Sequence, residues 1–274
     1  MGVSKWRRLP DTLYHEAPRP NFRITYGNHP SNFIDIRLPR SEPPYPTAIV
    51  IHGGFWKSAY NLKQTGHICA SLASAGIATC NVEFRRVGHA SGGWPTTFED
   101  LRLAMGKINE NVTRYGFDRD RIVLIGHSSG AHLAFWLGGE FARCREVNAT
   151  SMIVPAGLVS LAGVFDLVGL WHDSIPARPV LTKLLGGSLN ELEERYRLMS
   201  PTYNLPNVKK QLLVHGLRDR VVPYNSSRAY FEKSTRTGKD IDLLTLKTGH
   251  FSLLDPASGF WTDISGAILK VLKR

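Results

Sequence analysis

The chain has 274 residues, of which 42% are hydrophobic and 21% are charged, as in an ordinary folded globular protein. Lysine and arginine outnumber aspartate and glutamate by 34 to 23, which gives a formal net charge of +11. The basic residues are spread along the chain without a long block, so they predict a cationic surface and argue against a nucleic-acid-binding protein.

Three widely spaced cysteines, Cys69, Cys80 and Cys144, give an odd count and predict no disulfide framework. No apolar run is long enough to span a bilayer, and the first 20 residues lack the apolar segment of a signal peptide. We therefore expect a cytoplasmic protein with no stable membrane insertion. Without an internal repeat or a linker, residues 1–274 are predicted to form a single domain.

The first third of the chain predicts a sheet edge followed by alternating strands and helices. Residues 22–26 and 33–38 are short alternating runs around a turn, which predicts an antiparallel hairpin. Residues 47–51 predict a buried strand that ends in the loop His52-Gly53-Gly54-Phe55-Trp56. The next predicted elements are a helix over 69–75, a strand over 77–84 and an amphipathic helix over 97–115.

Residues 121–139, RIVLIGHSSGAHLAFWLGG, combine a buried strand, a sharp turn and a buried helix. This is the setting that a G-x-S-x-G nucleophile requires, with Ser128 at the turn. Gly126 and Gly130 allow the strand and the helix to approach closely. Ser129 lacks the symmetrical glycines, so its backbone N–H is the expected contribution. The pentapeptide alone leaves open a glycine-rich corner with an incidental serine.

The second half of the chain repeats the alternation of strands and helices. A strand over 153–161, interrupted by Pro155, precedes an insertion over about 166–200 that could form a small cap. The remaining predicted elements are a strand over 211–215, a helix over 224–235, a strand over 241–246 and a helix over 260–272. Together they predict an α/β protein with a doubly wound, mostly parallel sheet.

Two later strands end next to the residues that a serine nucleophile needs. Asp219 follows QLLVHG, and His250 follows LLTLKTG. Ligands bind at the carboxyl ends of the strands in such sheets, so Ser128, Asp219 and His250 are predicted to meet there. The imidazole would take the serine proton, and the carboxylate would hold the imidazole in the right tautomer. Asp166, after an earlier strand, is the rival acid.

The loop after the strand over 47–51 is the expected oxyanion hole. Gly53 and Gly54 can bring backbone N–H groups close to a substrate, and the N–H of Ser129 supplies a further donor. His52 is expected to brace this loop.

The motifs HGGFW, GHSSGAHLA, GLRDRVVP and TGHFSLLDP resemble the esterase and kynurenine formamidase branch of the α/β-hydrolase superfamily, from about residue 48 to the end. NVEFRRVG with GGWPTTFEDL most resembles the small esterase-type members. The resemblance implies the α/β-hydrolase fold and functional roles for six residues: Gly53, Gly54, Ser128, Ser129, Asp219 and His250. Phe84-Arg85-Arg86 stands where formamidases usually carry a tyrosine-containing stretch, a departure that argues against the formamidase substrate and not against the hydrolase chemistry.

These patterns predict a serine acyl hydrolase that cleaves small carboxylic esters through an acyl-enzyme. The alternative is an arylformamidase that hydrolyses N-formylkynurenine, and a more remote one is a non-catalytic ligand receptor on the same fold. An aromatic substrate pocket is predicted from Phe55, Trp56, Tyr60, Trp94, Phe165 and Trp171. No cofactor or metal is expected, because the histidines lack metal-ligand spacing. The expected partner is a small-molecule ester or amide, and a homodimer is left open.

Overall fold

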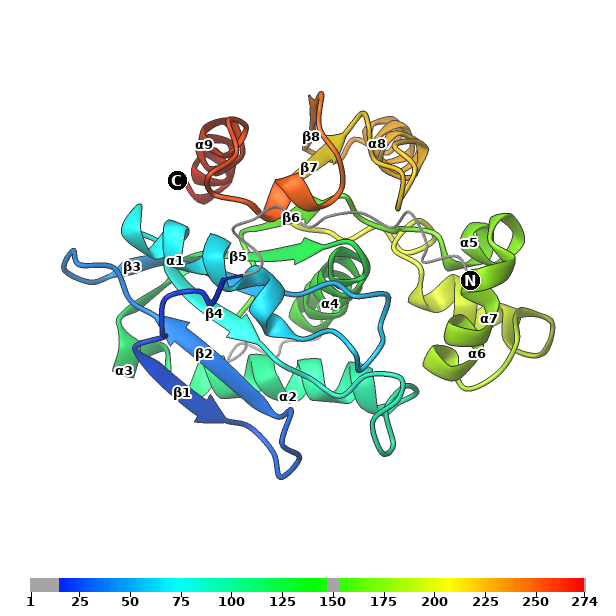
Figure 1. Ribbon diagram of the computed structural model, residues 1–274, viewed down its shortest axis with the longest axis horizontal. Coiled ribbons are helices and arrows are strands. Elements are labelled where there is room, and N and C mark those ends of the chain that lie inside the picture. The colour runs from blue at the N-terminus through cyan, green and yellow to red at the C-terminus, as the bar shows by residue number, and fades with distance from the viewer. Residues whose placement is uncertain (1–14, 147–152, 274) are drawn as a thin grey trace.

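The structure, a computed structural model, describes residues 15–146 and 153–273, with only the backbone for 141–146. Its strands form one sheet in the order β1-β2-β4-β3-β5-β6-β7-β8 (Figure 1). The strands are β1 Phe22–Thr25, β2 Phe33–Arg37, β3 Tyr45–Ile51, β4 Ala78–Val82, β5 Phe117–His127, β6 Gly157–Leu161, β7 Lys210–Gly216 and β8 Ile241–Leu246. The α-helices are α1 Gly66–Ser74, α2 Thr96–Glu110, α3 Val112–Tyr115, α4 Ser129–Glu146, α5 Leu167–Asp173, α6 Arg178–Leu185, α7 Leu189–Met199, α8 Asn225–Arg236 and α9 Trp261–Leu272. Three 3-10 helices are also present in the described residues: η2 Leu62–Thr65, η3 Ile175–Ala177 and η4 Phe251–Leu254.

The direction of the strands confirms the predicted doubly wound, mostly parallel sheet. β1 pairs antiparallel with β2, which is the predicted edge hairpin, and β2 also pairs antiparallel with β4. All pairs from β4 through β3, β5, β6 and β7 to β8 are parallel. The parallel strands all end at the same edge of the sheet, where the loops after β3, β5, β7 and β8 carry the residues singled out in the sequence.

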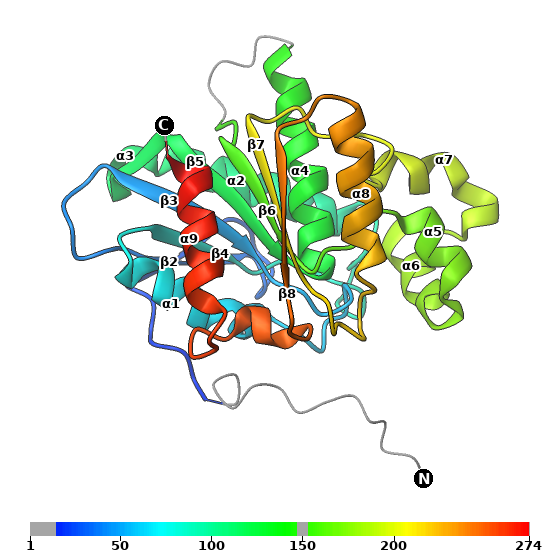
Figure 2. The same cartoon turned by 90° about the horizontal axis from the view of Figure 1, so that it is seen from above.

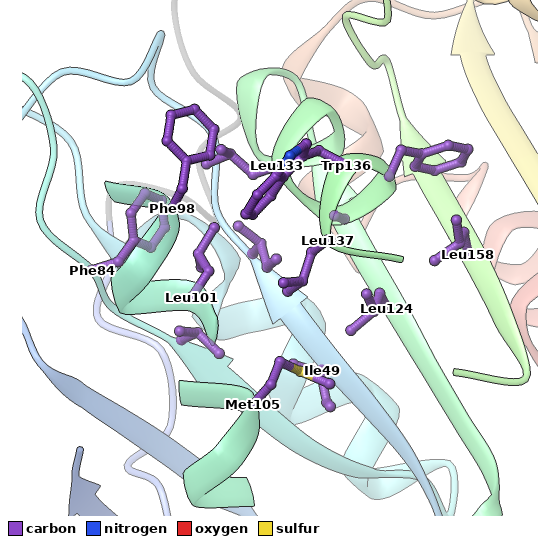
Figure 3. Packing of buried hydrophobic residues seen from close by; sticks show 14 of the residues in the cluster. Ile49, Phe84, Phe98, Leu101, Met105, Leu124, Leu133, Trp136, Leu137 and Leu158 are labelled. Atoms are coloured by element: carbon purple, nitrogen blue, oxygen red, sulfur yellow. The ribbon is translucent and has the colours of Figure 1, made fainter. Parts of the chain in front are cut away.

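Helices cover both faces of the sheet, so alternate residues of each central strand enter two separate cores (Figure 2). On β5, Leu124 packs into the core under α2, α4 and α8, whereas Val123 packs into the core under α1 and α9. Figure 3 shows side chains of α2 and α4, among them Leu101 and Leu137, directed at the strands on the first of these faces. Burial on both faces explains why these strands appear in the sequence as continuous apolar runs.

Two predicted elements have different boundaries, each for a local reason. The helix expected over 97–115 ends at Glu110, because the Asn111 side chain donates to the carbonyl of Lys107 at 2.8 Å and competes with the helical pattern. The strand expected from residue 153 begins only at Gly157. Pro155 has no N–H to donate to the sheet, so pairing starts beyond it.

The insertion between β6 and β7 is helical and contains α5, η3, α6 and α7. These helices lie together at one end of the molecule, on the right in both views (Figures 1 and 2). Contacts tie the insertion to α4 and to the loop after β6: His132 Nε2 lies 2.9 Å from the Met199 carbonyl, and the N–H of Thr202, just after α7, donates to the Phe165 carbonyl at 3.0 Å. The insertion is therefore fixed against the sheet on the face that α4 covers.

The corner between β5 and α4 has no room for side chains at its two glycines. A Cβ on Gly130 would lie 2.3 Å from the carbonyl oxygens of both Ile51 and His52. A Cβ on Gly126 would lie 2.3 Å from the carbonyl oxygen of Gly130. The glycines of the G-x-S-x-G motif thus allow β3, β5 and α4 to meet at the serine.

Gly130→Ala is therefore expected to destabilise the protein by about 3 kcal/mol, because backbone atoms must move to admit the methyl group. The matched control is Gly106→Ala in α2, where nothing lies within 4 Å of an added Cβ. This control should stabilise the helix by about 0.5 to 1 kcal/mol. Urea unfolding of both variants checks the pair, and equal effects would contradict the packing argument.

Within the described ranges, no helix is both long and apolar enough to cross a membrane.

Candidate active site

Ser128 occupies the sharp turn between β5 and α4. Its φ of +55° lies in the left-handed region, which residues other than glycine rarely adopt and which costs about 1 to 3 kcal/mol. The turn is held by the Ser128 N–H, which donates to the Leu161 carbonyl at 2.8 Å, and by the Ala131 N–H, which donates to Ser128 at 3.0 Å. The serine therefore sits at the N-terminal end of α4, where the helix dipole favours negative charge.

His250 and Asp219 form a buried pair at the ends of β8 and β7. Nδ1 of His250 lies 2.6 Å from Oδ2 of Asp219, and the two side chains are 2% and 0% exposed. The other carboxylate oxygen accepts from the N–H groups of Val221 at 2.8 Å and Val222 at 3.0 Å. An ionised carboxylate only accepts hydrogen bonds, so the imidazole carries its proton on Nδ1 and leaves Nε2 to take another.

The surroundings of Asp219 favour its ionised form. Burial by itself raises the pKa of Asp219, but the hydrogen bond and charge of His250 and the two backbone N–H groups outweigh it. The resulting pKa lies below the ordinary value. The carboxylate is thus charged at neutral pH, as a residue that orients an imidazole must be.

Contacts of His127, the residue before Ser128, bring His250 to the nucleophile corner. Nε2 of His127 lies 3.2 Å from the His250 carbonyl oxygen, and the two ring centroids are 4.6 Å apart. In the described part of the chain, no hydrogen bond joins the Ser128 hydroxyl to His250. Such bonds are often long in a site without substrate, so the proton relay between these two side chains stays a prediction.

Asp166, the rival acid, has a different role. Its Oδ1 accepts from the N–H of Gly169 at 2.9 Å, and its extended backbone places it at the N-cap of α5. The carboxylate that reaches His250 is that of Asp219.

The loop of residues 52–56 lies directly beside Ser128. A Cβ on Gly53 would lie 3.2 Å from Cβ of Ser128 and 2.8 Å from the His127 carbonyl oxygen. Gly54 has a φ of +109°, and a Cβ there would lie 2.3 Å from Cβ of Tyr60. Within the described residues, the N–H groups of Gly53 and Gly54 have no intramolecular acceptor. They are therefore available to a substrate oxygen near the serine.

The loop is also tied to the start of α4. The Trp56 N–H donates to the Ser129 hydroxyl at 3.4 Å, and the Trp56 indole N–H donates to Nδ1 of His132 at 3.2 Å. Ser129 is the first residue of α4, and the first N–H groups of a helix have no carbonyl acceptor within that helix. The structure thus gathers Gly53, Gly54 and Ser129 around Ser128.

Three buried polar side chains beneath this loop were not identified from the sequence as a connected group. His52 contacts the Gly53 carbonyl, and Arg86 bridges His52 and Glu83. Burial, followed by the charge of Arg86, lowers the pKa of His52 to about 3. The available signal was a pair of charges, Glu83 and Arg86, at the end of a buried strand, where charged residues need partners.

Buried neutral histidines predict that the protein loses stability in mild acid. Burial lowers the pKa of His132 to about 4, and that of His127 to well below its ordinary value. The same groups in the unfolded chain have a pKa of about 6.5, so below that pH the unfolded state binds more protons. For each of His52 and His132, the free energy of unfolding should fall by about 1.4 kcal/mol per pH unit from about pH 6.5 to about pH 4, and His127 should contribute in the same direction.

Chemical denaturation at a series of pH values measures this slope. His132→Gln should lower this slope by the contribution of one histidine. A slope that His132→Gln does not alter would contradict the assignment.

The six expected pocket residues do not share one location. Trp56 and Phe165 are each 1% exposed, so the prediction that these two line a pocket is wrong. Both are core residues: Trp56 packs edge-on against His132, and Phe165 stacks on Tyr230 at 4.2 Å. The aromatic side chains of these two residues serve to fill the core and not to line a pocket.

The other four expected pocket residues are partly exposed in two groups. Phe55 belongs to the loop of residues 52–56 beside Ser128, and Tyr60 lies against Gly54 of that loop. Trp171 packs edge-on against Tyr196 within the helical insertion, and the Arg195 guanidinium of α7 lies 4.4 Å from the ring of Trp94. Of these four residues, the structure therefore places Phe55 and Tyr60 at the loop beside Ser128.

Among the described residues, no group of three or more His, Cys, Asp or Glu side chains is arranged to hold a metal ion.

Comparisons with known proteins match this chain to one protein family and to proteins named as esterases. The model of the BD-FAE family matches residues 34–233, which is more than half of the chain. Esterase LipC of Mycobacterium tuberculosis is 28% identical over 254 residues, which cover 86% of this chain and 60% of LipC. The probable isoprenylcysteine alpha-carbonyl methylesterase ICMEL1 of Arabidopsis thaliana is 27% identical over 82% of this chain and 49% of its own length. The chain thus spans about half to three fifths of the length of these relatives.

Solved structures show the fold. A truncated carbohydrate esterase from gut microbiota superposes with a TM-score of 0.79 at 19% identity, covering 95% of this chain and 100% of that chain. Esterase B from Lactobacillus rhamnosis superposes with a TM-score of 0.77 at 19% identity, covering 95% of this chain and 88% of that chain. With the match to the family model, these findings show that the chain has the α/β-hydrolase fold and belongs to the BD-FAE family.

Proposed function

We propose that the protein is a serine esterase that hydrolyses small carboxylic esters through an acyl-enzyme intermediate. The observation that carries the proposal is the buried 2.6 Å pair of His250 and Asp219, which His127 holds against the turn of Ser128. The relatives named as esterases support the same chemistry.

In the proposed reaction, Nε2 of His250 takes the proton of the Ser128 hydroxyl as its oxygen attacks the ester carbonyl. The N–H groups of Gly54 and Ser129 bind the oxyanion of the tetrahedral intermediate. The intermediate collapses and expels the alcohol, which receives the proton from His250. Water then attacks the acyl-enzyme with His250 as the base, which releases the acid and restores Ser128. Asp219 stays ionised and stabilises the imidazolium in both steps.

We further propose that residues 1–274 act as one domain and that the insertion at about 166–200 is a cap beside the site. Four partly exposed aromatic side chains would then line the substrate path: Phe55, Tyr60, Trp94 and Trp171. Tyr60 and Trp94, which are 46% and 36% exposed, present the most open aromatic surface of this set. Such surfaces suit a substrate with an apolar or aryl group.

An arylformamidase acting on N-formylkynurenine would use the same residues, because a formamide carbonyl passes through the same tetrahedral intermediate. The relatives quoted above are named as esterases, so their names support the ester. The small-molecule ester or amide stays the proposed partner.

Parallel turnover assays with p-nitrophenyl acetate and N-formylkynurenine test the proposal. We expect the ester to be hydrolysed with the higher kcat/KM, and a fluorophosphonate to label Ser128 as judged by mass spectrometry. A higher kcat/KM for N-formylkynurenine would support the formamidase instead. A folded protein that turns over neither substrate and takes no label would support the ligand receptor and refute the proposal.

A further inference from the structure

A buried chain of polar side chains lies beneath the loop of residues 52–56. Glu83 and Arg86 form an ion pair just after β4, with side chains that are 5% and 3% exposed. Nη1 of Arg86 lies 2.8 Å from Nε2 of His52, and Nδ1 of His52 lies 2.7 Å from the Gly53 carbonyl oxygen. His52 is 1% exposed. Since solvent hardly reaches these groups, each one sets the orientation and protonation of the next.

Arg86 decides which nitrogen of His52 carries the proton. A guanidinium only donates hydrogen bonds, so Nε2 of His52 must accept and has no hydrogen. Burial keeps the ring neutral at pH 7 by lowering its pKa, and a neutral ring then carries its single proton on Nδ1. The His52 ring therefore donates from Nδ1 to the Gly53 carbonyl.

The Gly53 carbonyl and the Gly54 N–H belong to the same peptide unit. Because this peptide is trans, the two groups point in opposite directions, and a bond that fixes the carbonyl also fixes the N–H. Between two glycines such a unit can rotate at low cost, since Gly54, with a φ of +109°, has access to both signs of φ. The donation from His52 removes that freedom.

We infer that Arg86 is a positioning residue for the oxyanion hole. It holds His52 in the Nδ1–H tautomer, and His52 in turn holds the Gly53–Gly54 peptide with the Gly54 N–H directed at the oxyanion. The inference rests on the proposed function, because the oxyanion is that of the ester reaction.

Glu83 makes the role of Arg86 testable. Its Oε1 lies 3.4 Å from Nε2 of His52. Without Arg86, this carboxylate would favour the tautomer with the ring proton on Nε2. The unprotonated Nδ1 and the Gly53 carbonyl oxygen would then point their lone pairs at each other. The repulsion would turn the peptide and remove the Gly54 N–H from the oxyanion hole.

Arg86→Met is expected to lower kcat by about 10- to 100-fold with little change in KM, because the lost donor acts in the transition state. The concentration of active sites is measured by titration with a fluorophosphonate, so that kcat is calculated per folded molecule. In the double variant Glu83→Gln/Arg86→Met, the side-chain amide introduced in place of the carboxylate can donate to Nε2 and restore the Nδ1–H tautomer. The double variant should therefore regain most of the lost kcat, although it carries more changes than Arg86→Met.

Arg85→Met is the matched control. Arg85 pairs with the buried Asp100 at 2.6 Å, so its loss also strands a buried carboxylate, but it makes no contact with His52 among the described residues. We expect this variant to lose stability and to keep the wild-type kcat per titrated site.

NMR of ¹⁵N-labelled histidine reads the His52 tautomer without any turnover. We expect Nδ1–H in the wild type and Nε2–H in Arg86→Met. A wild-type ring with Nε2–H, a wild-type kcat in Arg86→Met, or a double variant no faster than Arg86→Met would each overturn the inference. The expected tautomers in a protein without ester turnover would refute the proposed function and leave the effect of Arg86 on His52 supported.

Discussion

Replacing Ser128 with alanine is expected to lower kcat for ester hydrolysis by about 10⁶-fold and to abolish fluorophosphonate labelling. The methyl group has no oxygen to attack the carbonyl, so the acyl-enzyme cannot form. Catalysis of about 10³- to 10⁴-fold over water would persist, because the oxyanion hole and substrate binding remain. Steady-state kinetics and mass spectrometry of the labelled protein measure both effects.

A second buried serine provides the control. Ser160 on β6 has a buried hydroxyl without a hydrogen-bond partner among the described residues, so its oxygen serves no detected contact. Ser160→Ala should keep the label and nearly all of the activity. Labelling of a Ser128→Ala protein at another serine would show that the nucleophile has been assigned to the wrong residue.

Asp219→Asn is expected to lower kcat by about 10⁴-fold with little change in the position of the imidazole. The asparagine amide can donate to Nδ1 of His250, which shifts the imidazole proton to Nε2. That nitrogen then cannot take the proton of Ser128. Since Asp219 lies 2.6 Å from His250, the effect should appear in kcat at every pH at which the native enzyme works.

Asp166→Asn separates the two candidate acids. Asparagine is also a good N-cap, so this variant should keep the N-terminus of α5 and the wild-type kcat. Asp166→Ala should cost about 1 kcal/mol of stability through loss of the cap, again with the wild-type kcat. A large loss of kcat in Asp166→Asn with a mild effect of Asp219→Asn would reverse the assignment.

The acid limb of stability adds an independent check on Asp219. Its pKa in the folded protein is lowered, so the ionised carboxylate stabilises the fold above the pKa of the unfolded chain. That contribution is lost as the pH falls through the lowered pKa. Asp219→Asn should therefore flatten the pH dependence of stability below about pH 4.

Local patterns in the sequence determined the order of strands and helices and the sharp corner at Ser128. These features depend on short-range physics: continuous apolar runs require burial on both faces of a sheet, and a Cβ on Gly126 would collide with the nearby backbone of Gly130. The chain order of Ser128, Asp219 and His250 was likewise visible, because each residue follows a strand.

Only the tertiary structure decided which side chains meet. Asp166 and Asp219 both follow strands, but Asp166 caps a helix through a local bond to Gly169, whereas Asp219 reaches His250, 31 positions away, only because the strands pack side by side. The contact of Arg86 with His52 joins residues 34 positions apart, and that of His127 with His250 joins residues 123 positions apart. Such pairs leave no periodic trace in the sequence.

The tertiary structure also determines that Trp56 and Phe165 are buried. An aromatic residue favours a core and a substrate pocket for the same reason, which is the apolar area it removes from water. The sequence therefore determined the corner on which the nucleophile stands, and the packing of distant elements determined the partners that surround it.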